Sequence, residues 1–340
     1  MAIGVPEHLG AQTEISTRAA TLRVGGRLHW QYQASSVEGA DDDFFIRRAR
    51  INVDVTLNDF VTGKVLTDFS SGRATLLDAY VRFDLDGALH LYAGQLKRAF
   101  DLFELASSTD LSLIERTGKV GGYSACSGIG SVCSYSRLTE ELAFSGRDAG
   151  VKLDGSSGDF SYQATVTNGT GVGVPDENDR KSISGRVSYA ATDNVLVSGQ
   201  LGVHDYVDSL DETTNAYAWG GDVQIGTWRD GFLLQAAAVG GDNWQSLDVL
   251  DEPGQFLALQ AVASRYYPLA GDWIIGVEPL LRLSVADPDD SISDDGGTLL
   301  TPGVMFYLMG KNKIGLNLDY YSPQTGAAVY SLRFATFLYF

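Results

Sequence analysis

The chain has 340 residues, 43 of them acidic and 25 basic, which gives a formal net charge of −18 at pH 7. Such an acidic chain lacks the basic surface that nucleic-acid binding requires, and a hydrophobic content of 44 % excludes a disordered chain. Glycine, tyrosine and phenylalanine are frequent and proline is scarce, which favours strands and turns, and no apolar run reaches the roughly 20 residues of a membrane-spanning helix.

Apolar and polar residues alternate along almost the whole chain. In the first such segment, Leu22, Val24 and Leu28 share one face, whereas Arg23 and Arg27 share the other. A period of two residues with one apolar face predicts a half-buried strand. The pattern predicts sixteen strands, over residues 19–33, 44–58, 60–71, 75–85, 88–96, 144–154, 158–168, 182–190, 193–206, 215–227, 230–240, 255–267, 272–285, 298–309, 312–322 and 328–340.

The lengths of these strands and of their connections indicate a membrane barrel. Strands of soluble proteins typically have about 5–6 residues, and a tilted strand that crosses a bilayer needs about 9–11, as most of these do. Connections on one rim are short, such as 58–59 and 269–271, whereas those on the other rim are long, such as 34–43 and 169–181. An even number of strands with loops sorted in this way is typical of outer-membrane barrels.

We therefore predict an all-β fold, a 16-stranded antiparallel transmembrane β-barrel in the bacterial outer membrane. Residues 1–18 form a short N-terminal extension and residues 19–340 form the barrel. Segment 97–143 is the longest interruption of the strand pattern, and long irregular segments are rare unless they are functional. We expect this segment to fold inward and narrow the channel. The alternative is an external cap whose charges are solvated.

Basic residues gather on one side of the predicted lumen. They lie on the first five strands and the last strand, which are neighbours in a closed barrel and so form one basic wall. Arginine offers paired N–H donors to carboxylate and phosphate oxygens. Four aspartates lie among these bases and neutralise part of the wall: Asp54, Asp68, Asp78 and Asp84. The residues predicted to line the pore and guide anions, including those of segment 97–143, are Arg23, Arg27, Arg48, Arg50, Lys64, Arg82, Lys97, Arg98, Arg116, Lys119 and Arg333.

The far wall of the predicted lumen, formed by residues 193–322, has a different character. Its inward positions carry mostly serine, glutamine and asparagine, with Arg282 as the lone strong base. Asp222, Glu278 and Asp319 also lie there. The two walls together predict a transverse separation of charge, which would orient passing dipoles.

Segment 97–143 also contains the only two cysteines, Cys126 and Cys133. In an oxidising compartment we expect them to form a disulfide. A metal site would need further cysteine or histidine ligands, and the four histidines lie elsewhere.

Acidic residues concentrate in five long connections, 34–43, 169–181, 204–214, 241–254 and 286–297. These contain 20 acids and two bases, a sum of −18 that equals the whole net charge. One interpretation is that the loops are simply solvated. The other is that divalent cations bridge them to anionic lipopolysaccharide. The candidate calcium ligands are Asp287, Asp289, Asp290, Asp294 and Asp295, and no other cofactor is expected.

Four short motifs resemble those of a known family. Phe-Ile-Arg-Arg-Ala-Arg at 45–50, Leu-Asp-Ala-Tyr at 77–80, Gly-Gln-Leu-Lys at 94–97 and Ile-Glu-Arg at 114–116 occur in an order similar to that of the phosphate-selective porin O and P family. The resemblance, clearest over about residues 20–120, implies a sixteen-stranded trimeric channel with inward-folded loops and a basic pore. It implies pore roles for Arg48, Arg50, Lys97, Arg98 and Arg116. A dense arginine ladder like that of phosphate-specific members is not found.

Pattern and resemblance together predict an outer-membrane porin for passive diffusion of small hydrophilic solutes, with anions such as phosphate preferred. The alternative is a structural or surface-interaction protein whose acidic loops bind divalent cations, lipopolysaccharide or an external layer. The expected partners are outer-membrane lipid, lipopolysaccharide and two further copies in a homotrimer, with no nucleic acid. An enzyme is not expected, because the sequence shows no nucleophile and base in a catalytic arrangement.

Overall fold

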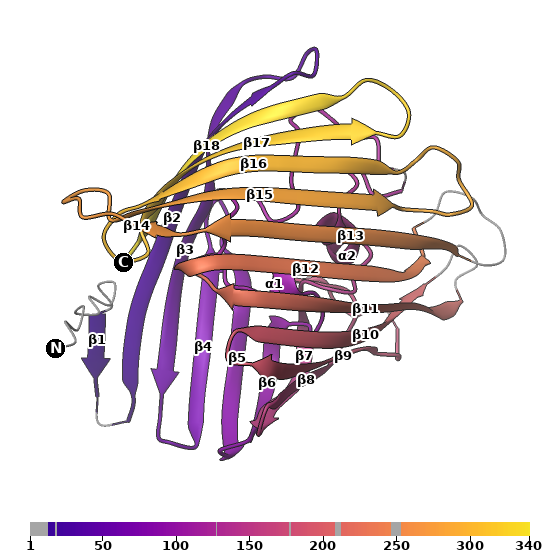
Figure 1. Ribbon diagram of the computed structural model, residues 1–340. Coiled ribbons are helices and arrows are strands. Elements are labelled where there is room, and N and C mark those ends of the chain that lie inside the picture. The colour runs from indigo at the N-terminus through magenta and orange to yellow at the C-terminus, as the bar shows by residue number, and fades with distance from the viewer. Residues whose placement is uncertain (1–12, 18, 127, 177, 208–211, 246–252) are drawn as a thin grey trace.

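The computed structural model describes residues 13–17, 19–126, 128–176, 178–207, 212–245 and 253–340. Sixteen long strands form a closed antiparallel barrel, as predicted, with two short helices inside it (Figure 1). The elements are β1 (Thr13–Ser16), β2 (Thr21–Ser35), β3 (Asp43–Thr56), β4 (Val61–Asp68), β5 (Thr75–Asp86), β6 (Leu89–Lys97), α1 (Leu102–Leu105), α2 (Tyr135–Glu141), β7 (Arg147–Ser157), β8 (Phe160–Thr167), β9 (Ser182–Thr192), β10 (Val195–Val207), β11 (Thr213–Thr227), β12 (Asp230–Asn243), β13 (Gly254–Arg265), β14 (Tyr267–Pro268), β15 (Gly276–Asp287), β16 (Gly297–Tyr307), β17 (Lys313–Pro323) and β18 (Val329–Tyr339).

The barrel closes between its first and last long strands. β18 pairs antiparallel with β2 over Ser331↔Ser35 to Tyr339↔Arg27, so no edge of the sixteen-stranded sheet stays open along this seam. The two extra strands are short. β14 pairs with the start of β15, and β1, which lies within the predicted N-terminal extension, pairs with the start of β2 below the seam (Figure 1).

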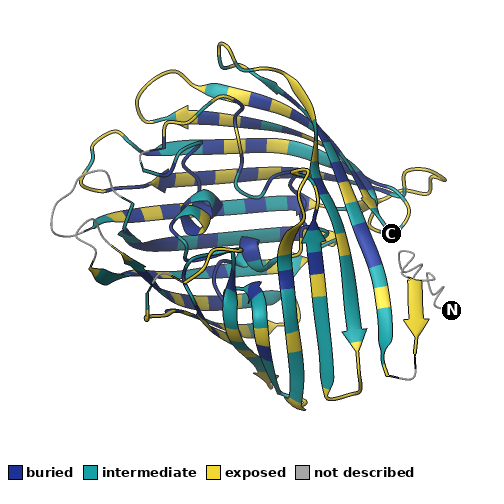
Figure 2. Ribbon diagram, turned by 180° about the vertical axis from the view of Figure 1, so that it is seen from behind, coloured by how far each residue is buried: buried dark blue, intermediate teal, exposed yellow. Residues whose placement is uncertain are grey.

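Burial along the strands is inverted relative to a water-soluble protein. On β15, Leu281, Leu283 and Val285 are exposed, whereas Arg282 and Ser284 between them are buried. The same alternation of buried and exposed positions runs along the neighbouring strands (Figure 2). Apolar side chains therefore cover the outside of the barrel and polar side chains face the lumen, which is the arrangement a lipid environment requires.

The turns of the short-loop rim lie at or within three residues of their predicted places. β11 and β12 are joined by 228–229, whereas β9 and β10 are joined by 193–194 instead of 191–192, and β7 and β8 by 158–159 instead of 155–157. The predicted turn 269–271 extends to residue 275, because the strand expected from residue 272 begins only at Gly276. Trp273 therefore lies in a turn and is largely exposed.

A β-bulge in β3 changes which side chains reach the lumen. Arg48 pairs with His29, but the next β2 residue, Trp30, pairs with Ile46, so Arg47 is an extra residue. A bulge re-aims the side chains around it. Strict alternation would send Arg47 to the lipid face, but it lines the lumen beside Arg48, and Ile46 is exposed on the outside instead.

The segment between β6 and β7, residues 98–146, is called the constriction loop below. It contains both helices and lies inside the barrel (Figure 1). Ser134 caps the start of α2 by accepting a hydrogen bond from the backbone N–H of Arg137. No helix among the described residues combines the length and the hydropathy that crossing a membrane requires.

The seam of the barrel predicts one effect on stability. The backbone of Gly26 exchanges hydrogen bonds with Phe340, and a Cβ at Gly26 would lie 2.4 Å from the Phe340 ring and 2.9 Å from the carbonyl oxygen of Arg50. Because the carbonyl belongs to the sheet, Gly26→Val should destabilise the barrel by about 1–3 kcal/mol through overpacking. The loss would be measured as a lower unfolding temperature, with the folded and unfolded forms separated on gels.

The matched control is Gly199→Val on the outer face of β10, where a Cβ meets no heavy atom within 4 Å. Equal unfolding temperatures for the two variants would contradict the steric account of the seam.

Candidate functional site

The constriction loop packs against the far wall through an apolar cluster. Phe100, Leu113 and Ile114 are among its buried loop residues, and Val239 and Phe256 are among its wall residues. Small inward side chains leave room for the loop. Those of the far wall are Ala216, Ala218, Ala237, Ala258 and Ala286, and Ala335 of β18 lies in the same cluster. The loop therefore excludes water from this side of the lumen.

The polar groups of the far wall are buried under the loop, which corrects the predicted transverse separation of charge. Asp222 pairs with Arg186 of β9, and Glu278 accepts hydrogen bonds from Ser264 and Tyr307. All five side chains are buried. The acids of the far wall are thus paired internally and do not face a water-filled channel.

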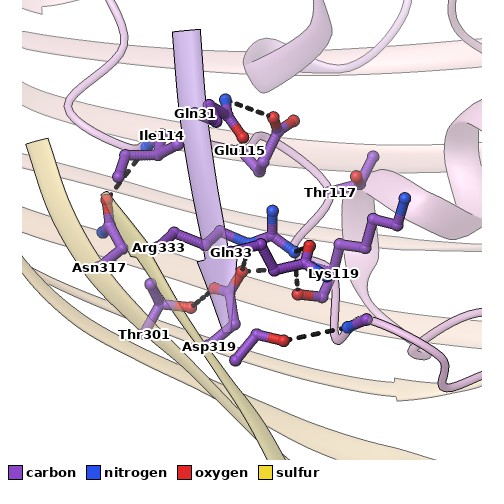
Figure 3. A network of polar contacts seen from close by, with 12 residues as sticks. Gln31, Gln33, Ile114, Glu115, Thr117, Lys119, Thr301, Asn317, Asp319 and Arg333 are labelled. Carbon is purple, nitrogen blue, oxygen red and sulfur yellow. Dashed lines mark hydrogen bonds and ion pairs between the residues drawn. The ribbon is translucent and has the colours of Figure 1, made fainter. Parts of the chain in front are cut away.

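A buried ion network centres on Asp319 of β17 (Figure 3). Its carboxylate accepts hydrogen bonds from Arg282 at 2.8 Å, Arg333 at 3.1 Å and Thr301 at 2.7 Å. Both arginines are almost completely buried. A carboxylate between two guanidinium groups satisfies charges that would be costly to bury alone.

The same network holds the constriction loop by its main chain. Arg282 donates to the carbonyl oxygen of Glu115 at 3.0 Å, and Arg333 donates to that of Lys119 at 2.5 Å. Asp319 accepts from the backbone N–H of Lys119 at 3.2 Å. The loop is therefore fixed to the wall by bonds that do not depend on its own side chains.

A cavity of about 420 Å³ lies between the loop and the basic wall. Its wall side comes from β2 to β7, and its other side comes from the constriction loop. Eight basic and four acidic residues line it, an excess of four positive charges: Arg27, Arg47, Arg48, Arg50, Lys64, Lys97, Arg116 and Arg147, with Asp78, Glu104, Glu115 and Glu140.

Most of the cavity bases have a carboxylate nearby. Although burial disfavours its charged form, the Arg47 and Arg48 guanidinium groups hold the pKa of Glu115 below its usual range, so this carboxylate is ionised at neutral pH. The wall and loop pairs are Arg47–Glu115 at 2.7 Å, Arg50–Asp68 at 2.6 Å, Lys64–Asp54 at 3.6 Å, Arg116–Glu104 at 2.7 Å and Arg147–Asp78 at 2.6 Å.

Two arginines are less well compensated. Arg27 makes no ion pair with any described residue and donates to Ser108 Oγ at 2.5 Å, while it sits directly opposite Arg50 across β2 and β3. Arg48 has its nearest carboxylate, Glu115, at 4.0 Å. Like charges directly opposite each other in a sheet are unfavourable. An anion beside Arg27 and Arg48 would relieve this repulsion.

Six of the predicted pore-lining bases lie at this cavity: Arg27, Arg48, Arg50, Lys64, Lys97 and Arg116. The other five lie elsewhere. Arg98, the first residue of the constriction loop, is buried and pairs with Asp148 at 2.7 Å. Arg333 is buried in the anchoring network, so neither base reaches the channel. Lys119 is exposed on the loop.

The last two of these bases lie near the short-turn rim. Arg23 is exposed there and pairs with Glu14 of β1 at 3.2 Å, and Arg82 pairs with Asp84 at 2.5 Å on the wall between the cavity and that rim.

Sequence reasoning missed two cavity residues, Arg47 and Arg147. Arg47 reaches the lumen only through the bulge. Arg147 is the first residue of β7, and the alternation of that strand places odd residues such as Val151 on the lipid face. The preceding Gly146 has φ +93°, a left-handed conformation that turns the returning chain. Gly146, directly before β7, is the one feature of the sequence that indicates this turn.

The constriction loop contains the predicted disulfide. Cys126 and Cys133 are joined, with their Cα atoms 5.1 Å apart, and both side chains belong to the apolar cluster. The cross-link therefore closes a small ring within the part of the loop that lies against the far wall.

The predicted calcium ligands lie at the end of β15 and in connection 288–296. Asp289 accepts hydrogen bonds from Ser291, and Asp290 accepts one from the Gln255 N–H at 3.0 Å. Burial and the nearby Asp287 and Asp289 carboxylates raise the pKa of Asp295 to about 7. No described group of three or more Asp, Glu, His or Cys side chains is arranged to hold a metal ion. The calcium site at Asp287, Asp289, Asp290, Asp294 and Asp295 therefore stays a prediction.

Solved structures similar to this chain are outer-membrane channels. OmpF of Salmonella typhi aligns with a TM-score of 0.65 at 11 % identity, covering 96 % of this chain and 100 % of that one. DcaP of Acinetobacter baumannii gives 0.63 at 13 % identity with 95 % and 99 % covered, and OmpT of Vibrio cholerae gives 0.62 at 14 % with 95 % and 100 % covered. At these identities the likeness establishes the fold. No curated protein matches the sequence significantly.

The fold and the lumenal site are those of an outer-membrane porin, a channel for small solutes. The family model for phosphate-selective porin O and P matches residues 22–229, more than half of the chain. The chain belongs to the phosphate-selective porin O and P family, which confirms the resemblance noted in the sequence. Its location is the outer membrane, which the barrel crosses with its sixteen strands.

The anchoring network predicts an effect on channel recordings. Asp319→Asn would leave the buried Arg282 and Arg333 without the one carboxylate that pairs with both, and breaking a buried pair costs about 3–5 kcal/mol. The loop should loosen, and single-channel recordings should show a larger and noisier conductance. Thr301→Val removes the hydrogen bond to Asp319 and the two that Thr301 accepts from Arg282, but it leaves the ion pairs in place. It should show a smaller effect, and it serves if the first variant folds poorly.

Asp84→Asn is the control, because Asp84 pairs with Arg82 on the lumen wall, away from the loop. Wild-type conductance and noise in a folded Asp319→Asn channel would refute the anchoring role.

Proposed function

We propose that this porin conducts small hydrophilic anions, phosphate among them, by passive diffusion along the basic wall. The observation that carries the proposal is the composition of the cavity, which is lined by eight basic and four acidic residues. Because the loop covers the far wall, solutes pass on the basic side. The family description, phosphate-selective, supports the same class of solute.

The electrostatics favour anions without requiring tight binding. A positive potential in a narrow aqueous passage raises the local concentration of anions and lowers that of cations. Arginine offers two parallel donors to an oxyanion. Arg27 forms no ion pair with a described residue, and Arg48 has its nearest carboxylate, Glu115, only at 4.0 Å. The ion pairs between the remaining bases and their carboxylates reduce the positive electrostatic potential in the cavity. We therefore expect the channel to prefer anions and to let them pass rapidly.

Removing the least compensated charge tests the proposal. Arg27→Gln should lower the anion-to-cation permeability ratio about tenfold, since one positive charge about 6 Å from a solute in water favours an anion by about 0.7 kcal/mol and disfavours a cation by the same amount. Reversal potentials in a potassium chloride gradient would measure this ratio. Arg23→Gln on the same strand and face is the matched control, because Glu14 pairs with Arg23 at the rim.

A wild-type channel that passes potassium in preference to chloride would overturn the anion assignment. An inserted barrel that conducts neither ion would favour the alternative, a surface-interaction protein.

We also propose that the porin is a homotrimer. OmpT of Vibrio cholerae, which has the same fold, is described as a trimer. Cross-linking of the detergent-solubilised barrel, with light scattering to give its mass, should show a species of about three times the 36.6 kDa chain. A monomeric mass with unchanged conductance would refute this assembly.

A further inference from the structure

Three cationic groups converge on the side chain of Glu104, which follows Phe103 in α1. Its carboxylate lies 2.7 Å from Arg116 Nη1, 3.6 Å from Lys97 Nζ and 3.9 Å from Arg147 Nη1. These bases come from the loop, from the end of β6 and from the start of β7, so separate parts of the chain meet at one point. All four residues line the cavity.

The three bases do not need the carboxylate to hold their positions. Arg116 donates to the carbonyl oxygens of Phe103 at 2.5 Å and Ala106 at 2.8 Å. Lys97 donates to the carbonyl oxygens of Glu104 and Ala106. Arg147 is held separately by Asp78 at 2.6 Å. Without the Glu104 carboxylate, the remaining groups would form a preorganised anion site.

We infer that Glu104 is a specificity-determining residue, a tethered carboxylate that occupies an oxyanion site formed by Lys97, Arg116 and Arg147. The inference rests on the proposed function. Two carboxylate oxygens bind the same donors that phosphate oxygens would bind. While Glu104 is ionised, a phosphate ion meets an occupied site, and it passes the cavity without being held there.

The other carboxylates of the cavity do not have this geometry. Glu115 binds Arg47 and also accepts a hydrogen bond from Gln31 at 2.8 Å, so it joins the loop to the wall. Glu140 lines the cavity but forms no ion pair with a described residue. Burial opposes the charge of Glu104, but Arg116 and Lys97 hold its pKa below the usual range, so Glu104 is charged at neutral pH.

The experiment is inhibition of the chloride current by inorganic phosphate at pH 7. In Glu104→Gln, phosphate should enter the vacated site, and half-maximal inhibition should occur at a phosphate concentration at least tenfold below that of the wild type. Glu140→Gln removes an equal charge from the same cavity and should lower the half-maximal phosphate concentration by about threefold at most, which is the effect of one charge about 6 Å from a solute in water. Glu104→Ala should behave as Glu104→Gln does and serves if the glutamine variant folds poorly.

A second change links the new inhibition to the proposed site. Lys97→Met combined with Glu104→Gln removes one of the three bases and should restore much of the wild-type tolerance of phosphate. If Glu104→Gln and Glu104→Ala respond to phosphate like the wild type, or if Glu140→Gln shows the same increase, the inference fails. A cation preference of the wild-type channel would instead refute the proposed function, so the two failures are distinguishable.

Discussion

The contact between the constriction loop and the far wall is the interaction on which the channel depends. A sixteen-stranded barrel encloses a wide lumen, and here apolar loop residues such as Phe100 and Ile114 cover the small side chains of β11 to β18. Water is thereby restricted to the side of β2 to β7, where the bases lie. Without this contact, the charges of the two walls would act together on a wide passage.

Because the constriction loop buries the far wall, it also determines which charged side chains act on a solute in the channel. Asp222, Glu278 and Asp319 lie on lumen-facing positions, yet each is buried and bound to neighbouring groups. Asp222 and Asp319 contribute little field at a distance, because their arginine partners cancel most of the charge. Glu278 is bound by hydroxyl groups and does not line the cavity. The potential in the channel is therefore set by the cavity residues, and the net charge of the chain, located mainly in external loops, is a poor guide to it.

The sequence predicted the architecture well, because the period-two pattern and the loop lengths can be read from short stretches of sequence. A bilayer requires apolar side chains on the outer face of every strand, so the pattern has few exceptions. The sequence also predicted that segment 97–143 folds inward and contains the disulfide. The sequence-based prediction failed at residues whose orientation or burial depends on contacts with other parts of the chain. Arg47 turns inward because of a bulge whose register depends on β2, and Arg333 is buried because a loop distant in sequence covers it. The apolar residues within segment 97–143, such as Phe100 and Leu113, were the available signal that it packs against a wall.

The balance of charge in the cavity suggests how a porin combines selectivity with throughput. An arginine cluster without counter-ions would attract anions strongly but would also release them slowly, because a deep well lengthens residence. Carboxylates supplied by the loop, Glu104 and Glu115, reduce the depth of this well while Arg27 and Arg48 keep a net positive field. Since these acids lie on the loop and most of the bases lie on the barrel wall, changes in the loop alone can shift the channel between weak attraction and specific binding while the strands stay unchanged.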